Sequence, residues 1–349
     1  MGDAFPTTDS VMYQTIHRQP ADASTLLEHG WADAEAAATI IAGANRIWLT
    51  GIGTSYHAAL VGGWLLRFAG KDARAVTSFD FATYPNQYPV GSGDAVILLA
   101  HTGVKSHSAR ALERAAAQAG AVISIGSESA EHPGSQAILR TCIRETSAAY
   151  TSSHLCAQIR LAQLAVLLGA GNLRDELMTL PDHLATIIAR FAEIEGPARE
   201  ASSRHIYAIG AGPNEPVALE FVIKAREAAM QQADGLGAEQ YFHGPIVPVD
   251  ENDYGIAVTQ FGPALERTKA IIGAVRELGA PIWTTGDADP ELGGTHFATP
   301  PITEALSPLL NVVPIQIFAY HLAAIRGTHP DRFRREDPVY ANAFGLLTL

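Results

Sequence analysis

The chain has few cysteines and no long apolar run. Its two cysteines, Cys142 and Cys156, form neither a CxxC pair nor a disulfide framework, which favours a reducing compartment such as the cytoplasm. No apolar stretch approaches the length of a membrane span, and the N-terminus lacks the basic-then-apolar order of a secretory signal. No cluster with metal-ligand spacing appears either, so the sequence predicts neither a metal site nor a cofactor.

Positive charge is also scarce, with 24 lysines and arginines against 36 acidic residues and a net charge of −12. Such a balance repels phosphate backbones and argues against nucleic acid as a partner. A small anionic ligand would have to be held locally, by backbone N–H groups and hydroxyls. What the chain does have is apolar residues, 47% of its 349 positions, which is enough for two hydrophobic cores.

The sequence repeats itself over the length of a whole domain. RIWLTGIG at Arg46 returns as HIYAIGAG at His205, and DAVILLAHTG returns as DYGIAVTQFG, at an offset of about 160 residues. In each copy, β-branched runs alternate with Ala/Leu-rich stretches, which indicates parallel strands joined by helical crossovers. We therefore predict an α/β fold with two tandem domains, residues 1–195 and 196–349, each a doubly wound parallel sheet flanked by helices.

The first copy carries a predicted anion site where two strands end. In GIGTSYHAAL, Gly53, Thr54 and Ser55 stand between a strand and a helix, so backbone N–H groups and hydroxyls converge at a helix N-terminus. The next strand ends in a turn that offers His101, Thr102, Lys105 and Ser106. Tyr56 takes the place of the third glycine of a dinucleotide motif, which disfavours a nicotinamide cofactor. A plain strand-to-helix turn with a hydroxyl cap is the simpler alternative.

The second copy lacks that cradle and offers acid and base groups instead. Its equivalent turn reads GAGPNE, in which Glu215 would repel a phosphate. Further on, Lys224 and Glu227 lie three residues apart on one face of a largely buried helix, and His243 precedes Gly-Pro in a loop. A buried glutamate can act as a general base while a nearby ammonium keeps it ionised at rest. An ordinary ion pair and a loop histidine are the alternative interpretation.

Taken in order, these segments resemble the SIS (sugar isomerase) family. The resemblance is closest to the isomerase portion of glucosamine-fructose-6-phosphate aminotransferase and to free-standing glucosamine-6-phosphate deaminase and fructosamine-6-phosphate deglycase relatives. It covers nearly the whole chain, including ETSAAYTSSH, ALEFVIKAREAA, EQYFHGP and VVPIQIFAYHLAAIRGTHPD. It implies that the turns containing Ser55 and Thr102 bind the phosphate of an open-chain 6-phosphosugar, with Thr151 in a third ligand-facing turn.

The same resemblance implies roles for the second copy. Glu227 matches the family's proton-shuttling glutamate, Lys224 matches its helix lysine, and His243 matches its ring-opening histidine. In relatives that histidine comes from the neighbouring subunit, so the resemblance implies a homodimer with shared active sites.

Three departures from the family pattern stand out. In the usual SxSGxT turn this chain has Ala100 and Lys105, so one hydroxyl is lost and a cation is gained. The family's C-terminal lysine falls near Pro338, and no lysine follows Lys269. A glutamine-hydrolysing domain is not expected, because the duplicated unit starts within about fifty residues of Met1.

The predicted chemistry is a proton transfer between C1 and C2 of a 6-phosphosugar amine, without glutaminase activity. The first choice is a deaminase of glucosamine 6-phosphate or a deglycase of a fructosamine 6-phosphate. A plain aldose–ketose isomerase is the second. A sugar-phosphate sensor without turnover is the third, although such regulators usually carry a DNA-binding segment and this sequence has no basic helix-turn-helix extension.

Overall fold

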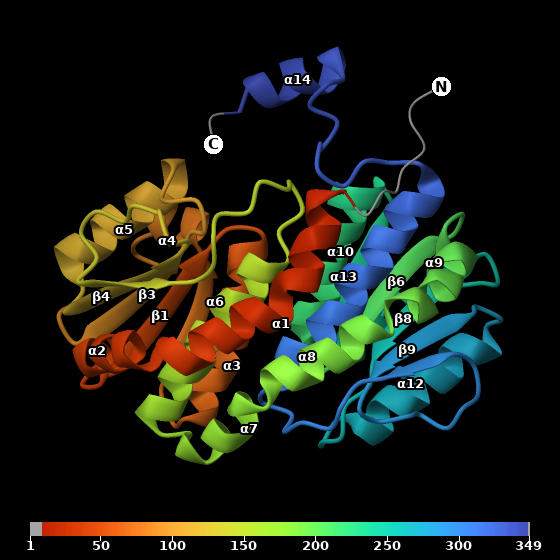
Figure 1. The fold of residues 1–349 in the computed structure, drawn as a ribbon, viewed down its shortest axis with the longest axis horizontal. Coiled ribbons are helices and arrows are strands. Elements are labelled where there is room, and N and C mark those ends of the chain that lie inside the picture. The colour runs from red at the N-terminus through yellow and green to blue at the C-terminus, as the bar shows by residue number, and fades with distance from the viewer. Residues whose placement is uncertain (1–8, 348–349) are drawn as a thin grey trace. The chain divides into compact units, whose positions relative to one another are not determined.

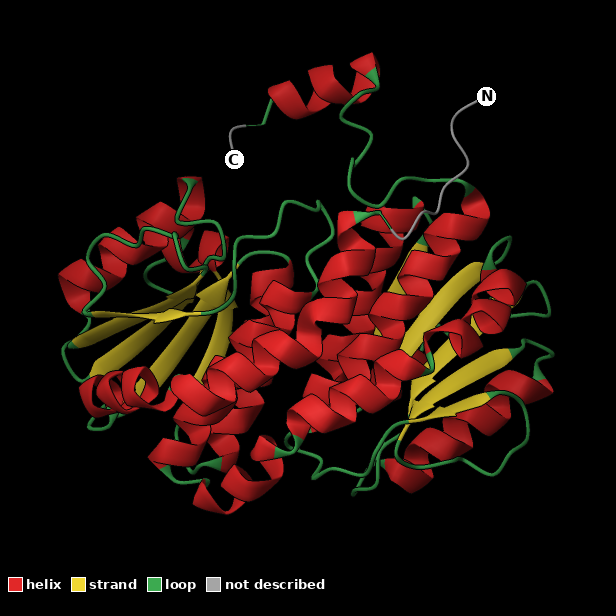
Figure 2. Ribbon diagram, in the orientation of Figure 1, coloured by secondary structure: helices red, strands yellow, loops and turns green. Residues whose placement is uncertain are grey.

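The computed structural model describes residues 9–347 and contains two five-stranded sheets that are parallel throughout (Figures 1 and 2). The chain forms two compact units, neither of which is continuous in sequence. The first-sheet unit comprises Ala21–Glu145, Ser152–Met178 and the segment from Arg334 onward. The second-sheet unit comprises the segment up to Pro20, Thr146–Thr151 and Thr179–Phe333.

The predicted domains, 1–195 and 196–349, divide the chain by its sequence repeat. Their first eight positions and their last two lie outside the described residues. The compact units group the connecting helices from Thr179 onward with the second sheet. The predicted boundary between residues 195 and 196 describes the sequence repeat and stays a prediction.

The first sheet has the strand order β2-β1-β3-β4-β5. Its strands are β1 (Arg46–Gly51), β2 (Ala73–Thr77), β3 (Asp94–Leu99), β4 (Ala121–Gly126) and β5 (Ala137–Arg140). One face is covered by α4 (Ser78–Thr83) and α5 (Ser106–Gln118), and the other by α2 (Trp31–Ile41), α3 (Thr54–Phe68) and α6 (Ser152–Leu168). Because helices cover both faces, every residue of β3 and β4 is buried.

The second sheet repeats this order as β7-β6-β8-β9-β10. Its strands are β6 (His205–Gly210), β7 (Ala233–Gly237), β8 (Asp253–Val258), β9 (Ile282–Gly286) and β10 (His296–Ala298). One face packs on α11 (Ala238–Phe242) and α12 (Leu265–Glu277), and the other on α10 (Glu215–Ala229) and α13 (Ser307–Arg326). The matching order confirms the predicted fold class of two doubly wound parallel sheets.

The remaining helices connect or flank these layers. They are α1 (Val11–His29), α7 (Arg174–Met178), α8 (Leu180–Ala189), α9 (Glu195–Ala201) and α14 (Pro338–Gly345), with short 3₁₀ turns at Gly171–Leu173, Phe191–Ile194 and Gly212–Asn214. The sequence analysis expected no stretch of this kind, but among the described helices α13 has the length and apolar composition of a membrane span. Because 89% of its apolar window is buried within the fold, it is a core helix.

The strand order fixes where a ligand can enter each sheet. In the first sheet β1 lies between β2 and β3, so the connections that leave β1 and β3 diverge and open a crevice at the carboxyl ends of these strands. The GIGTS turn follows β1 and the HTGVK turn follows β3. Both predicted anion-binding turns therefore lie at the topological switch point of the first sheet.

Candidate active site

The GIGTS turn joins β1 to α3 through backbone that only glycine adopts easily. Gly53 stands at the N-cap of α3 with φ 58° and ψ −130°. A Cβ on Gly51 would lie 2.6 Å from the carbonyl carbon of Ser55, so the chain turns too tightly there for any side chain. Gly53 offers no capping side chain, and Thr54 and Ser55 are half-buried. This turn presents a helix N-terminus and two hydroxyls at the switch point, as in many anion sites.

The turn after β3 is strained at the start of α5. Ser106 has φ 41°, in the left-handed region that non-glycine residues seldom occupy, and such strain costs about 1–3 kcal/mol. The Ser108 hydroxyl accepts from the Lys105 N–H at 2.8 Å and donates to the Lys105 carbonyl at 2.7 Å, which fixes the turn. The Lys105 side chain is exposed and has no ion-pair partner among the described residues. It can therefore reach an anion in front of the turn.

Glu145 ties this turn to the start of α6. Its N–H donates to Nε2 of the half-buried His101 at 3.1 Å. Its own buried carboxylate accepts from the Ser152 N–H at 2.8 Å and from the Ser153 hydroxyl at 2.7 Å. The sequence analysis did not single out Glu145. An acidic residue just ahead of a long apolar helix was the available signal, because carboxylates satisfy the N–H groups of a first helical turn.

Thr151 has a different environment from the other predicted ligand contacts. It is fully buried in the second-sheet unit, and its hydroxyl lies 2.7 Å from the hydroxyl of Thr15. Its carbonyl accepts a long hydrogen bond from Gln316 at 3.4 Å. These contacts are structural, and the predicted ligand contact of Thr151 stays a prediction.

Lys224 lies in α10 with its side chain fully buried between two carboxylates. Its Nζ is 2.9 Å from Oε2 of Glu227 and 3.3 Å from Oε1 of Glu220. Burial lowers the pKa of Lys224, but the two carboxylates outweigh burial and hold the pKa above its ordinary value. The lysine is therefore charged throughout the physiological pH range.

Glu220 is the residue of this cluster that the sequence analysis missed. It precedes Lys224 by one helical turn, and the E-x3-K-x2-E spacing was the signal that places all three side chains on one helix face. The Glu220 side chain is 0% exposed, whereas that of Glu227 is 28% exposed. Glu220 thus anchors the ammonium, and Glu227 is the carboxylate that a ligand can reach.

The start of α10 has residues that favour helix N-termini. Asn214 is the N-cap residue, the helix begins at Glu215, and Pro216 lies in the first turn, where its missing N–H costs nothing. The predicted shared face of Lys224 and Glu227 follows from this register.

His243 directly follows α11, and its side chain is 64% exposed. Its Nε2 lies 3.0 Å from Oε1 of Glu239, which also accepts two hydrogen bonds from Arg267, at 2.6 and 2.9 Å. The hydrogen bonds from Arg267 and His243 lower the pKa of Glu239 to about 2. Glu239 is therefore ionised at working pH and orients the imidazole. The exposed pair itself adds little stability.

The two predicted groups fall in different units. The predicted phosphate-binding turns belong to the first-sheet unit, and Lys224, Glu227 and His243 belong to the second-sheet unit. Each group is locally ordered by its own hydrogen bonds and ion pairs, as described above.

The family described as SIS domain matches residues 40–167 and 201–326, one match for each sheet. Glutamine–fructose-6-phosphate aminotransferase (isomerizing) of Pyrococcus horikoshii is 26% identical over 339 residues, which is 93% of this chain and 56% of that protein. The chain spans about half the length of the curated relatives that it matches.

Solved structures show the same fold. The C-terminal domain of glucosamine-fructose-6-phosphate aminotransferase from Francisella tularensis has a TM-score of 0.84 at 20% identity, covering 93% of this chain and 98% of that one. Glucosamine-6-phosphate deaminase from Thermotoga maritima has a TM-score of 0.74 at 20% identity, covering 93% and 97%. At these identities the similarity establishes the fold alone.

Proposed function

The chain belongs to the SIS domain family, and from that premise we propose that it is an enzyme that transfers a proton between C1 and C2 of a 6-phosphosugar amine and releases the amine. The observation that carries the proposal is the charged cluster of Glu220, Lys224 and Glu227. Burying Lys224 together with the Glu220 carboxylate is costly and is rarely a net gain in stability over apolar packing. A carboxylate that stays partly exposed beside a permanently charged lysine is what a general base requires.

The roles follow from exposure. Glu227 takes the proton from one carbon and returns it to the neighbouring carbon, across an enaminol intermediate. Lys224 is fully buried, so it acts through Glu227 as a positioning residue that keeps the carboxylate ionised at rest. His243, held by Glu239, donates a proton to the ring oxygen and opens the sugar ring.

The phosphate is assigned to the switch point of the first sheet. Ser55 and Thr102 supply hydroxyls, and the N-terminus of α3 supplies backbone N–H groups. Lys105 supplies a charge where the family turn has a hydroxyl, and an ammonium–phosphate contact is stronger than a neutral hydrogen bond.

The amine-releasing reaction is balanced by water. In an amino sugar with nitrogen on C2, moving the C2 proton to C1 leaves a C=N bond at C2, which water hydrolyses to a ketose and ammonia. With nitrogen on C1, the reverse transfer leaves the C=N bond at C1 and yields an aldose and the free amine. An aldose–ketose isomerase uses the same proton transfer on a sugar without the amine, and it is the alternative function.

A homodimer with shared sites is part of the proposal. The imidazole of His243 is largely exposed, and beside it Phe242 and Val247 are exposed by 40% and 81%. An acid that protonates a ring oxygen works best out of bulk water, and exposed apolar side chains favour cover by another surface. We therefore assign that cover to a second copy of the chain.

A substrate screen tests the proposed function. The protein is offered glucosamine 6-phosphate, fructosamine 6-phosphates and unmodified 6-phosphosugars, without glutamine, while amine release and exchange of the C1 and C2 protons with solvent are followed together. Amine release with exchange supports the proposal. Exchange without release assigns the isomerase instead, and binding without either assigns a sensor.

A further inference from the structure

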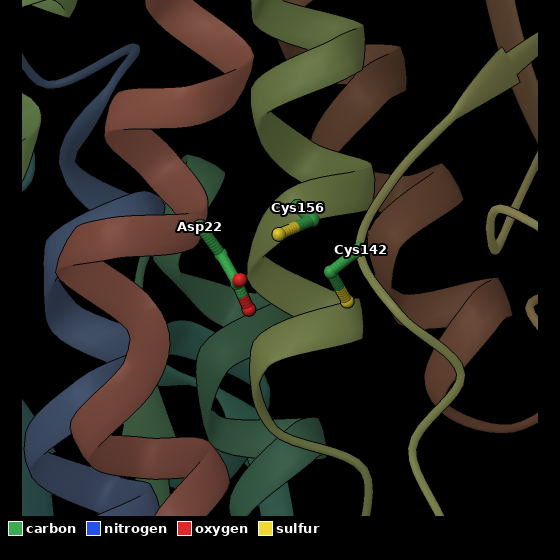
Figure 3. A group of neighbouring side chains, drawn as sticks. All are labelled: Asp22, Cys142 and Cys156. Atoms are coloured by element: carbon green, nitrogen blue, oxygen red, sulfur yellow. The ribbon is translucent and has the colours of Figure 1, made fainter.

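Three potential metal ligands meet in the first-sheet unit, outside the residues assigned to the proposed reaction (Figure 3). One carboxylate oxygen of Asp22 and the sulfurs of Cys142 and Cys156 all lie within 4.8 Å of one another. Both cysteines are buried, and Asp22 is half-buried. The three side chains come from α1, from the loop after β5 and from the second turn of α6.

A fourth polar atom lies beside this cluster. The Ser152 hydroxyl donates to Oδ2 of Asp22 at 2.5 Å and lies 3.8 Å from the sulfur of Cys156. Ser152 and Cys156 are one turn apart on α6, so the helix itself fixes their spacing.

The spacing of these ligand atoms suits an ion with tetrahedral coordination. Zinc–sulfur bonds of about 2.3 Å at tetrahedral angles put two thiolate sulfurs about 3.8 Å apart. Since the three ligand atoms already lie within 4.8 Å of one another, shifts of about 1 Å or less would bring them to that geometry. Shifts of this size need rotamer adjustment and no refolding.

We propose that Asp22, Cys142 and Cys156 form a binding site for one thiophilic divalent cation, Zn²⁺ foremost, with the Ser152 hydroxyl or a water molecule as the fourth ligand. Two thiolates and a carboxylate match the mixed sulfur and oxygen preference of Zn²⁺. Mg²⁺ and Ca²⁺ are disfavoured because they require sets of oxygen ligands.

A disulfide between the two cysteines is the competing use of the same sulfurs. The two uses are separable, because only the reduced thiols bind a cation.

The bound cation would anchor a functional segment. Cys142 and Ser152 bracket residues 143–151, which carry the buried Glu145 that contacts His101. An ion held by the Cys142 side of this segment, by α6 and by α1 would fix the path of the chain at this point. The site is therefore structural, and its occupancy should be measurable without any substrate.

Cobalt is a direct probe, because Co²⁺ takes zinc sites and its bond to a thiolate gives an intense near-ultraviolet charge-transfer band. The chain has only two cysteines, so such a band can arise only from this pair. Full-length protein, reduced and treated with chelator, is titrated with Co²⁺ and then with Zn²⁺. We expect saturation at one Co²⁺ per chain, tetrahedral visible bands, and loss of all bands on adding Zn²⁺.

Variants localise the signal. Cys142→Ser and Cys156→Ser should abolish the charge-transfer band, and Asp22→Asn should weaken Co²⁺ binding at least tenfold. Glu28→Gln, an exposed carboxylate on the same helix, is the matched control and should bind like the parent. If a cysteine variant fails to fold, equilibrium dialysis of the parent against Zn²⁺, before and after alkylation of both thiols, gives the same information.

Two results would overturn the proposal. One is a reduced, folded parent that binds no Zn²⁺ in dialysis, or that binds Co²⁺ with visible bands alone, as histidines would. The other is a cobalt–thiolate charge-transfer band that persists in both Cys142→Ser and Cys156→Ser. A parent that loses two hydrogens under mild oxidant, and shows no cobalt band when reduced, would assign the sulfurs to a disulfide.

Discussion

At the residue scale, Lys224 is paired with two carboxylates at once. Its ammonium is shared by a fully buried carboxylate on Glu220 and a partly exposed one on Glu227, so its loss leaves the buried Glu220 carboxyl group without this ammonium. Removing one partner of a buried ion pair typically costs about 3–5 kcal/mol. This cost is not evident from the sequence, because Glu220 stands within a run of apolar residues.

We therefore predict that Lys224→Met lowers the free energy of unfolding by several kcal/mol, and that adding Glu220→Gln restores much of the loss. Urea unfolding of the two single variants and the double variant measures the coupling. Lys269→Met is the matched control, because Lys269 pairs with exposed Glu266 at the same spacing, and it should change stability by less than about 1 kcal/mol. Equal losses in Lys224→Met and Lys269→Met would contradict the account.

His132, which contacts the start of the turn after β3, predicts that stability depends on pH. Its Nε2–H donates to the Ala100 carbonyl at 2.9 Å, and its buried Nδ1 has no hydrogen-bond partner among the described residues. Burial lowers the pKa of His132 below the ordinary 6.5, so the unfolded chain takes up a proton at a pH where the folded chain does not. The contribution of His132 to stability is complete above about pH 6.5 and declines as the pH falls toward the folded-state pKa.

His132→Gln keeps an N–H donor and removes the titration. We expect the melting temperature of the parent to fall more steeply than that of the variant between about pH 6.5 and pH 5. His29→Gln, at an exposed histidine, should follow the parent. Parallel curves for the parent and His132→Gln would show that His132 does not titrate as described.

At the scale of elements, α6 depends on a carboxylate supplied from outside the helix. The Glu145 carboxylate accepts two hydrogen bonds from the first residues of α6. The Glu145 N–H donates to His101 in the turn after β3. Glu145→Gln should lower stability by about 1.5–3 kcal/mol through the loss of charge-assisted hydrogen bonds. It should also weaken binding of a 6-phosphosugar more than it slows proton exchange at saturation.

Calorimetric titration and saturating exchange kinetics separate these effects. Glu131→Gln, an exposed carboxylate on the neighbouring loop, is the control. If Glu145→Gln is less stable but binds the 6-phosphosugar as tightly as the parent, Glu145 does not couple the start of α6 to ligand binding at the turn after β3.

Much of this arrangement could be predicted from the sequence because it is local. The paired strand repeats, the glycines of GIGTS and the start of α10 at Asn214 and Pro216 follow from periodicity and backbone preference. The left-handed Ser106 could not be predicted, because residue type gives no warning of a strain imposed by its surroundings. Nor could the meeting of Asp22 with the two cysteines, since tertiary packing brings together segments that are distant in sequence.

At the scale of the whole molecule, the two copies of the repeat share a strand order and differ in the side chains that they carry. Both sheets have the same strand order, but only the first retains the glycine and hydroxyl turns, while the second holds the buried charge cluster. The compact units are discontinuous in sequence, a feature that the repeat alone does not predict. The exposed His243 is the residue through which we propose that a second copy contributes to the active site.

Subunit sharing predicts complementation. Glu227→Gln and His243→Ala should each be inactive alone, and mixed under conditions that exchange subunits they should recover part of the activity, because one site in a hybrid dimer keeps both groups. A mixture of His243→Ala with itself, treated in the same way, is the control. Subunit exchange without recovery would place both residues in a site made by one chain.

Glu227 is the group proposed to move the carbon-bound proton, and one variant tests this role most directly. Glu227→Gln preserves volume and hydrogen bonding but removes the base, whose loss typically costs 10² to 10⁴ in rate. The measurement is exchange of the C2 proton of a 6-phosphosugar amine with solvent, at saturating ligand and with affinity determined in parallel. We predict that exchange is lost while affinity stays within a few-fold of the parent. Normal exchange in a folded Glu227→Gln protein would contradict the account and leave Glu227 as one half of a structural ion pair.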